Sequence, residues 1–334
     1  MLEATTFRKL RLWIRGKQHH RYALYSLETL ESSAGSASAT EAPNSVRNAI
    51  SLVRLMNGST LKYFWRREKF FRLRRKGEKF VLVRHEETWL LPTSDSVISP
   101  QLCAEGEFDL KKLVTAIQVL RGYRLTTIID VGAHIGSICV PAVSRGWFAR
   151  AIAIEPDPIN FSLLKANLLL NGVGDRVSVI DAPVGGIDGA VLARKDGGAN
   201  SGDHRFTPVD SSTFEESRPT TTGIVLDSLY ESVEPRGALL WMDIQGAEGV
   251  ALMGSRKLLS REIPVVLEFD AKLLEPNGGL SVGFNLLTNY EGFVDLGSKS
   301  VGVLPMSELE ELYAISLESG SSFDLLFLPI QSRD

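Results

Sequence analysis

The sequence predicts a doubly wound, mostly parallel α/β sheet that follows a basic N-terminal extension. Short apolar strands alternate with helices from about residue 105 onward, and the strand that begins at Thr127 runs directly into a turn with two glycines. The charge is uneven: residues 1–84 hold 18 Lys and Arg against 6 Asp and Glu, and the other residues hold 19 against 34. We therefore expect an extension over residues 1–104 and an α/β domain over 105–330.

Length and composition exclude several classes. A chain of 334 residues with 44% apolar side chains can bury a large core. Cys103 and Cys139 have no metal-ligand spacing, as is typical of a reducing compartment. The chain has no apolar run of about eighteen residues and no signal-peptide pattern. We expect a cytoplasmic protein, whose basic extension allows a peripheral contact with the inner face of a membrane.

The first part of the extension has weak local signals. Apolar residues over 1–30, among them Leu10, Trp13 and Ile14, show some helical spacing. Residues 32–45 hold a Ser- and Ala-rich stretch with no large apolar side chain to anchor it, which predicts a flexible linker. A short helix is expected over 46–56.

Residues 61–72 then interleave aromatic and basic side chains, ahead of an alternating strand at 80–83. The interpretation that we favour is a strand with a buried aromatic face and an exposed basic face. Contact with an anionic membrane or glycan surface is the second interpretation. Nucleic acid ranks lower, because no recognised RNA- or DNA-binding motif accompanies the segment.

The α/β domain opens with a helix whose apolar side chains fall on one face from Leu110 to Leu120, ending before Gly122. Asp157 predicts the N-cap of a second helix, which ends at Asn171. A polar, glycine-rich stretch over 183–225 predicts hairpins or a loop. Two later helices are expected. One follows the strand at 239–243 and runs through Leu258 and Leu259, and the other covers about 283–290. The predicted strands are 127–130, 151–154, 177–180, 239–243, 264–269 and 323–328.

The turn after the first strand carries the clearest chemical signal. Asp130 ends the strand, and Gly132 and Gly136 follow in a G-x-x-x-G spacing, which is not the G-x-G-x-x-G that holds a pyrophosphate. A looser turn with an acid before it suits a ligand with an amino group and a positive sulfur. The pattern therefore predicts S-adenosylmethionine, with Asp130 near the methionine end of the cofactor. Further contacts are expected from Ala133, His134 and Ser137.

A second acid supports this prediction. Glu155 ends the next strand, where an acidic side chain in a doubly wound sheet accepts hydrogen bonds from both ribose hydroxyls. The alternative is that the segment 155–157 only caps a helix. We expect Pro156, Asn160 and Asp181 to line the same cofactor pocket.

These motifs resemble the FkbM-type methyltransferase family over about residues 105–328. The resemblance implies a class I methyltransferase (Rossmann-like) fold and, most often in that family, methyl transfer to a hydroxyl of a sugar or a secondary metabolite. His134 stands where the family has Asn, Met242 where it has Lys, and Gln245 where it has Glu. The matching segments are Asp130-Val131-Gly132-Ala133-His134-Ile135-Gly136, Glu155-Pro156-Asp157-Pro158-Ile159-Asn160, Leu226-Asp227-Ser228-Leu229 and Met242-Asp243-Ile244-Gln245-Gly246-Ala247-Glu248.

Catalytic candidates follow from the same segments. Asp243 ends the fourth strand at the ligand-binding edge of the sheet, and Glu248 follows in the next helical turn. His204 lies in a glycine-containing loop, and histidine is the residue type whose ordinary pKa is nearest to neutral pH. Glu268 ends the fifth strand at the same edge. No ligand spacing requires a metal, although these carboxylates could hold a divalent ion if they converge.

The sequence therefore favours an S-adenosylmethionine-dependent O-methyltransferase that acts on a glycan, a glycolipid precursor or a small hydroxylated metabolite. Two alternatives stay open. Met242 and Gln245 allow a non-catalytic, cofactor-binding relative, and the basic segment 61–75 allows a nucleic-acid methyltransferase.

Overall fold

A computed structural model describes residues 12–14, 23–25, 58–195, 205–208, 220–298 and 301–330. The chain divides into two compact units, Met1–Arg72 and Leu73–Asp334. The predicted linker at 32–45 and the predicted helix at 46–56 lie outside the described residues. Among the described residues, no helix is both long and apolar enough to span a membrane.

The first unit differs from both predictions made for its described residues. β1 (Leu12–Ile14) and β2 (Ala23–Tyr25) form an antiparallel pair, so the helical interpretation of Trp13 and Ile14 is wrong. α3 (Gly58–Arg75) is a helix where we favoured a strand. The segment 61–75 has no β-branched residue and is rich in Arg, Lys, Glu and Leu, and these helix formers outweigh its aromatic residues.

One face of α3 is basic. Lys62, Trp65, Lys69 and Arg72 are exposed and follow the i, i+3, i+4 spacing of a single helix face. The Lys69 Nζ lies 5.6 Å from the centroid of the Trp65 ring. Contact of this face with an anionic surface stays a prediction.

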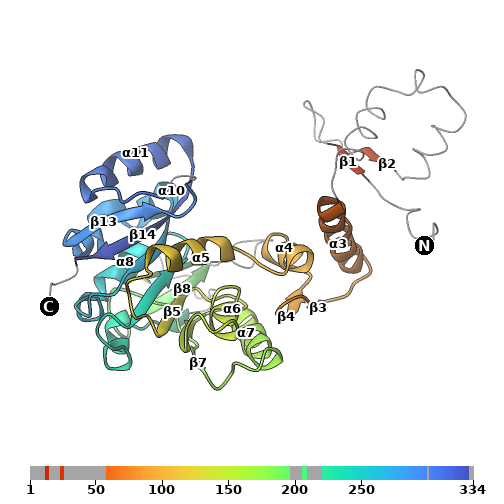
Figure 1. Cartoon of the computed structure of the whole chain (residues 1–334), viewed down its shortest axis with the longest axis horizontal. Helices are drawn as coiled ribbons and strands as arrows, with labels where there is room; N and C mark the ends of the chain where they lie inside the picture. The colour runs from red at the N-terminus through yellow and green to blue at the C-terminus, as the bar shows by residue number, and fades with distance from the viewer. Residues whose placement is uncertain are drawn as a thin grey trace, which may run out of the picture. The chain divides into compact units, whose positions relative to one another are not determined.

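The second unit is built on a seven-stranded sheet (Figure 1). β5, β6, β7, β11 and β12 are parallel to one another, and β14 runs antiparallel between β12 and β13. The doubly wound, mostly parallel sheet is thus confirmed. The order of the strands is β13 (Tyr290–Asp295), β14 (Phe323–Pro329), β12 (Val265–Phe269), β11 (Ala238–Met242), β5 (Thr127–Val131), β6 (Arg150–Ile154) and β7 (Val177–Ile180).

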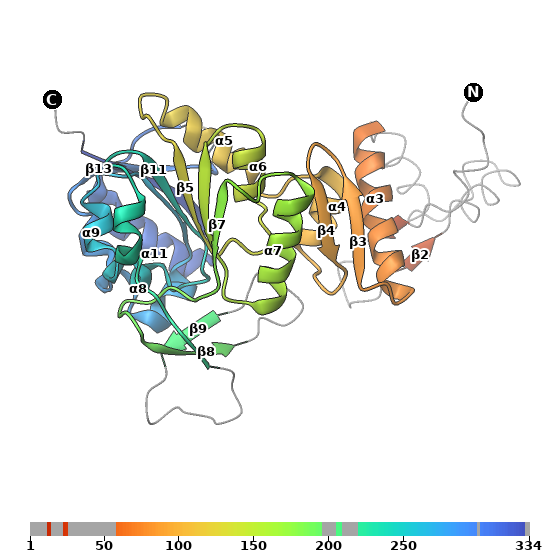
Figure 2. The ribbon, with the colours of Figure 1, turned by 90° about the horizontal axis from the view of Figure 1, so that it is seen from below.

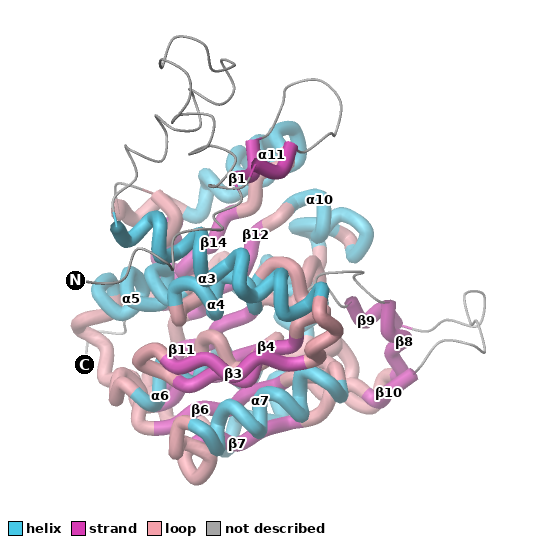
Figure 3. Tube along the Cα trace, turned by 90° about the vertical axis from the view of Figure 1, so that its right-hand side faces the viewer, coloured by secondary structure: helices cyan, strands magenta, loops and turns pink. Residues whose placement is uncertain are grey.

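Helices cover the sheet, and Figure 3 shows α6 and α7 in front of the strands on one face. Asp157 caps α7 as predicted, accepting hydrogen bonds from the backbone N–H groups of Ile159 and Asn160. The helices of this unit are α4 (Ile98–Glu105), α5 (Leu110–Val119), α6 (Cys139–Ser144), α7 (Pro158–Leu170), α8 (Glu248–Met253), α9 (Arg256–Leu259), α10 (Ala271–Leu274) and α11 (Leu309–Ser319). Short 3-10 turns lie at Leu226–Ser232, Glu275–Asn277, Gly279–Ser281, Phe284–Leu287 and Met306–Glu308.

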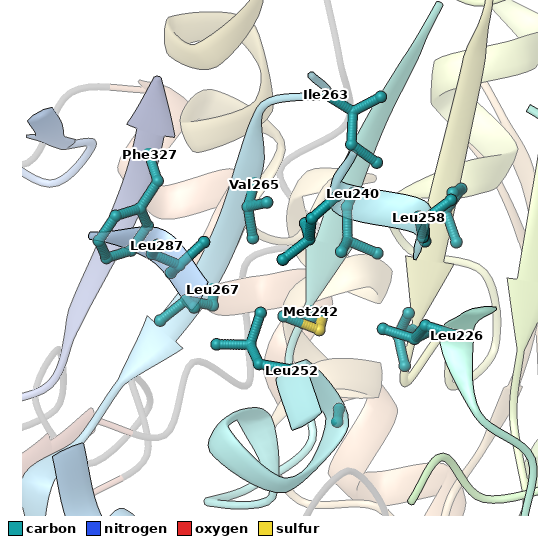
Figure 4. Packing of buried hydrophobic residues seen from close by; sticks show 14 of the residues in the cluster. Leu226, Leu240, Met242, Leu252, Leu258, Ile263, Val265, Leu267, Leu287 and Phe327 are labelled. Atoms are coloured by element: carbon teal, nitrogen blue, oxygen red, sulfur yellow. The ribbon is translucent and has the colours of Figure 1, made fainter. Parts of the chain in front are cut away.

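Alternation along the strands divides the two faces of the sheet. Leu240 and Met242 of β11, and Val265 and Leu267 of β12, point into the main hydrophobic core, where they meet Leu252 and Leu258 (Figure 4). The residues between them, Trp241 and Val266, therefore face the other side of the sheet. Asp130 and Glu268 share that second face, since each lies one residue along its strand from a core side chain.

The glycine-rich stretch forms the expected hairpins in part. β8 (Val191–Lys195) pairs with β9 (Arg205–Pro208) and with β10 (Thr220–Thr222) in a small antiparallel sheet beyond the end of the main strands (Figure 2). The helix predicted over 283–290 is wrong. Only the 3-10 turn at Phe284–Leu287 forms, and Tyr290 already begins β13.

A hairpin of β3 (Phe80–Arg84) and β4 (Thr88–Pro92) also belongs to the second unit. Two asparagines of the α7 region fasten it there. The backbone N–H of Leu90 donates to the Asn167 Oδ1 at 2.7 Å, and the N–H of Thr88 donates to the Asn171 Oδ1 at 2.8 Å. Residues ahead of position 105 thus pack directly on the α/β core.

Candidate active site

Four carboxylates lie at one edge of the sheet, on or just after four adjacent strands. Asp130 belongs to β5 and Asp243 follows β11, both parallel strands that end at this edge. Glu268 lies near the end of β12, and its Cα partner is Asp324 near the start of the antiparallel β14. Because paired residues point to the same face of a sheet, the row extends from β5 across to β14.

Glu155, at the end of β6, fastens two loops with one buried carboxylate. Its Oε2 accepts a hydrogen bond from the backbone N–H of His134 at 2.7 Å, and its Oε1 accepts one from the N–H of Asp157 at 2.8 Å. Burial raises the pKa of Glu155 to about 7, although both backbone donors oppose the rise. The Asn160 side chain also hydrogen-bonds this carboxylate, which leaves about one of its four lone pairs to accept a ligand hydroxyl.

This carboxylate borders the first of two pockets, which we call the Glu155 pocket. Of the residues predicted to contact the cofactor, Gly132, His134, Glu155, Pro156 and Asn160 line it. Ala182, Pro183 and Val184 close its far side, after β7. The pocket therefore combines a carboxylate with an apolar wall.

The glycine turn lies between the tips of β5 and β11. Gly132 has a φ of 84°, and a Cβ at that position would collide with the backbone carbonyl of Asp243. The N–H groups of Gly132 and Ala133 both donate to the Ile154 carbonyl at 3.0 Å, which ties the turn to β6. His134 takes a left-handed φ of 52° and lines both pockets. Gly132 therefore allows the close approach that the site needs.

Asp130 anchors the helix that follows the turn. Its Oδ2 accepts a hydrogen bond from the backbone N–H of Cys139 at 3.1 Å, the first residue of α6. Burial raises the pKa of Asp130 to about 7 against the effect of this donor.

The second pocket, the Glu268 pocket, has a cavity volume of about 250 Å³. Its floor is the face of the sheet that carries Trp241 and Val266, and its wall comes from residues 97–109. The predicted cofactor residues Asp130, Gly132, Ala133, His134 and Ser137 line it. The remaining lining residues are Val97, Ile98, Phe108, Asp109, Ile138, Trp241, Met242, Val266, Asp243, Gln245, Glu268 and Asp324.

Gln245 joins two of these acids. Its Nε2 donates to the Asp243 Oδ1 at 2.8 Å and to the Glu268 Oε2 at 3.1 Å. Its left-handed φ of 57° is rare for a residue with a side chain, and it places the amide between the two carboxylates. Burial raises the pKa of Asp243, and burial together with the neighbouring Asp243 charge raises the pKa of Glu268. A hydrogen bond between the two acids lowers the pKa of Asp243 and raises that of Glu268, so Glu268 is the partner that keeps its proton to higher pH.

Lys112 of α5 supplies a cation behind the wall of this pocket. Its Nζ lies 2.7 Å from the Asp324 carboxylate and 3.0 Å from that of Asp109. Burial lowers the pKa of Lys112, but the two carboxylates outweigh burial and raise it above its usual range. Burial raises the pKa of Asp324 to about 6, with Lys112 opposing.

Glu248, a predicted catalytic residue, lines neither pocket. It is 1% exposed, and its Oε1 accepts a hydrogen bond from the backbone N–H of Ile244 at 2.9 Å. Burial raises its pKa to about 8. This geometry supports the turn that presents Asp243 and Gln245.

Replacement of Glu248 by Gln should change how stability depends on pH. The folded protein keeps Glu248 protonated up to about pH 8, whereas the carboxyl ionises near its ordinary value of 4.5 in the unfolded chain. The unfolded chain binds fewer protons in that window, so this residue lowers wild-type stability as pH rises, by up to about 1.4 kcal/mol per pH unit. Denaturant unfolding should show that the free energy of unfolding of Glu248→Gln, relative to that of the wild type, is higher at pH 8 than at pH 5. Glu310→Gln, at an exposed position, should track the wild type, and a Glu248→Gln difference independent of pH would contradict the assignment.

Three predicted residues lie elsewhere. Gly136 lines neither pocket; a Cβ there would press on Val140 and Leu164, so it serves the packing of α6 against α7. Asp181 is exposed just after β7, next to lining residue Ala182. His204 lies outside the described residues.

The sequence did not predict the pocket-lining residues that come from outside the segments around Asp243 and Glu155. Phe108 and Asp109 precede α5, and Asp324 lies on a late antiparallel strand, where no motif marks them. Pairing of the strand at 323–328 beside β12 would have placed Asp324 opposite Glu268. Among the described residues, no group of three or more His, Cys, Asp or Glu has the arrangement of a metal site.

Residues 130–286 match the family model described as the methyltransferase FkbM domain. No curated protein matches the chain. An O-methyltransferase from Bacillus cereus, solved in complex with SAH, is 13% identical, with a TM-score of 0.37 over 85% of this chain and 97% of that one. TYW2 from M. jannaschii, in complex with AdoMet, is 11% identical, with a TM-score of 0.36 over 75% and 87%. An RNA methyltransferase from Salinibacter ruber, in complex with S-adenosyl-L-homocysteine, is 12% identical, with a TM-score of 0.29 over 67% and 95%.

Proposed function

Because residues 130–286 match the model of the methyltransferase FkbM domain, we propose that this chain transfers a methyl group from S-adenosylmethionine to a hydroxyl of an acceptor. The acceptor class that we propose is a glycan, a glycolipid precursor or a small hydroxylated metabolite. The observation that carries the proposal is the pair of adjoining pockets, with Glu155 in one and the Asp243–Gln245–Glu268 cluster in the other.

The Glu155 pocket fits the nucleoside part of the cofactor. Glu155 has acceptor capacity left for a ribose hydroxyl, and the apolar wall of Ala182, Pro183 and Val184 suits a purine ring. Gly132 lines both pockets, and its lack of a Cβ lets the turn lie against the Asp243 carbonyl. Asp130 offers a carboxylate on the side where the amino group and the sulfonium would lie.

When bound, the cofactor supplies an electrophilic methyl carbon on a positive sulfur. An acceptor hydroxyl oxygen would bond to that carbon with S-adenosylhomocysteine as the leaving group, and the hydroxyl proton would need a base. Asp243 is the base that the geometry favours, because it lines both pockets. Gln245 holds its carboxylate in place, and Glu268 keeps its proton to higher pH.

The departures from the family pattern at Met242 and Gln245 fit a working enzyme. Met242, which stands where the family has Lys, has a fully buried side chain in the hydrophobic core. Because that core lies on the other face of the sheet, this difference does not alter the carboxylates of the pocket. Gln245 donates to Asp243 and Glu268 where a third acid would repel them. These contacts support catalysis over a role in cofactor binding alone.

Methyl transfer can be tested with isotope-labelled S-adenosylmethionine and a panel of hydroxylated, amino and thiol acceptors, each product being analysed by mass spectrometry and NMR. We expect a methyl ether as the product, together with S-adenosylhomocysteine in equal amount. A product methylated on nitrogen or sulfur would contradict O-methylation. Cofactor binding with no transfer to any acceptor would favour the non-catalytic relative.

A further inference from the structure

The row of carboxylates continues past the end of the site that the cofactor needs. Across the sheet the order is β6, β5, β11, β12 and β14, so Glu155 on β6 and Asp324 on β14 mark opposite ends. Adjacent strands lie about 4.8 Å apart, which puts Glu268 and Asp324 one and two strands beyond Asp243. This remote end, bounded by Asp109, Glu268 and Asp324, is the part of the Glu268 pocket that is left for the acceptor.

The charge of this pocket is strongly one-sided. Of the residues that the structure describes, five carboxylates line it and no Lys or Arg does. Lys112, behind the wall, compensates one of the pair Asp109 and Asp324, and the proton that the raised pKa keeps on Glu268 neutralises one of the pair Asp243 and Glu268. One negative charge remains in each pair. Since S-adenosylmethionine carries a net single positive charge, the pocket stays negative with the cofactor in place.

Buried carboxylates that repel one another favour a ligand that supplies the missing cation. Burial is the main cause of the raised pKa of Glu268, and the charges of Asp243, Glu248 and Asp324 add to it. A cationic group among these acids would relieve that repulsion, whereas an anionic group would increase it. Phe108 and Trp241 add apolar surface suited to the carbons of a ring.

We propose that the remote end, formed by Asp109, Glu268 and Asp324, binds an ammonium group of the acceptor, so that the substrates are hydroxylated amines of the amino-sugar type. This inference rests on the proposed function and narrows its acceptor class. The carboxylates accept hydrogen bonds from the ammonium group and from neighbouring hydroxyls, and an acidic or phosphorylated acceptor is rejected.

The test uses the full chain saturated with S-adenosylhomocysteine and three matched probes, the methyl glycosides of glucosamine, glucose and glucuronic acid. Calorimetry should show binding in the order glucosamine, glucose, glucuronic acid, and labelled methyl transfer should follow the same order. Asp324→Asn should weaken binding of the glucosamine probe about tenfold and leave the glucose probe nearly unchanged. Lys112→Met should strengthen binding of the glucosamine probe, because it removes the cation that compensates Asp109 and Asp324. Lys111→Met, at the exposed neighbouring position, and Asp175→Asn, in an exposed loop, are the matched controls.

Equal binding of the three probes, a preference for glucose or glucuronic acid, or no binding of the glucosamine probe would overturn the inference. So would a loss of glucose binding equal to that of glucosamine in Asp324→Asn, since that result indicates general damage to the pocket. These outcomes leave the proposed function standing as long as S-adenosylhomocysteine binds and a hydroxyl is methylated. Failure of S-adenosylhomocysteine to bind the folded wild type would instead remove the proposed function.

Discussion

Glu155→Ala should abolish measurable cofactor binding while the protein stays folded. The substitution removes the acceptor for a ribose hydroxyl and, with it, the hydrogen bonds from the His134 and Asp157 N–H groups and the Asn160 side chain that shape the pocket. Hydrogen bonds to a charged group contribute about 1.5–3 kcal/mol each, so the dissociation constant for S-adenosylhomocysteine should rise by at least about 100-fold. Isothermal titration calorimetry measures this directly.

Two comparisons separate loss of binding from loss of structure. Glu155→Gln should also bind weakly, because its amide NH₂ would face one of the two backbone donors. Glu105→Ala, on the surface of α4, should bind like the wild type. Near-UV circular dichroism should show native packing in all three variants. Wild-type affinity in a folded Glu155→Ala protein would contradict the role of Glu155.

Asp243→Asn should leave cofactor affinity within about threefold of the wild type and lower kcat by about 100-fold, the usual contribution of a general base. The asparagine keeps the size of the side chain and an oxygen that can accept from Gln245, so the turn should persist. What it loses is the carboxylate that takes the hydroxyl proton. Single-turnover methyl transfer measures the chemical step apart from product release.

The pH profile distinguishes a base from a merely structural acid. Burial raises the pKa of Asp243 and of its partner Glu268, so the wild-type rate should rise with pH through the titration of this pair. The residual rate of Asp243→Asn should lose that rise, whereas Asp175→Asn should keep both the rate and the profile. A variant that retains the wild-type kcat and profile would show that Asp243 only orders the turn.

The parallel part of the fold was predictable because each of its signals is local. Residue type and spacing are enough to predict the strand that ends near Asp130 and the capped helix after Asp157. The late elements were less predictable. β13 begins at Tyr290, and Gly292 with its irregular register interrupts the alternation of apolar and polar residues that would signal a strand.

The candidate site divides in the same way. Glu155 and Asp130 follow from their places at strand ends, a rule that holds for any doubly wound sheet. Asp324 reaches the pocket only because the antiparallel β14 inserts beside β12, and Lys112 of α5 lies outside the pocket, where it pairs with Asp324. Long-range pairing decides both positions, and no spacing along the chain expresses it. Glu248 lies near Asp243 in sequence, yet the left-handed turn at Gln245 and Gly246 directs it beneath the site.

The central claim, that the two adjoining pockets form a methyltransferase cofactor site, is tested most directly by calorimetry of the wild-type protein with S-adenosylhomocysteine. The account predicts one binding site per chain, with an affinity that Glu155→Ala removes and Asp243→Asn preserves. No binding of S-adenosylhomocysteine to a folded wild-type chain, or binding that survives in Glu155→Ala, would contradict it.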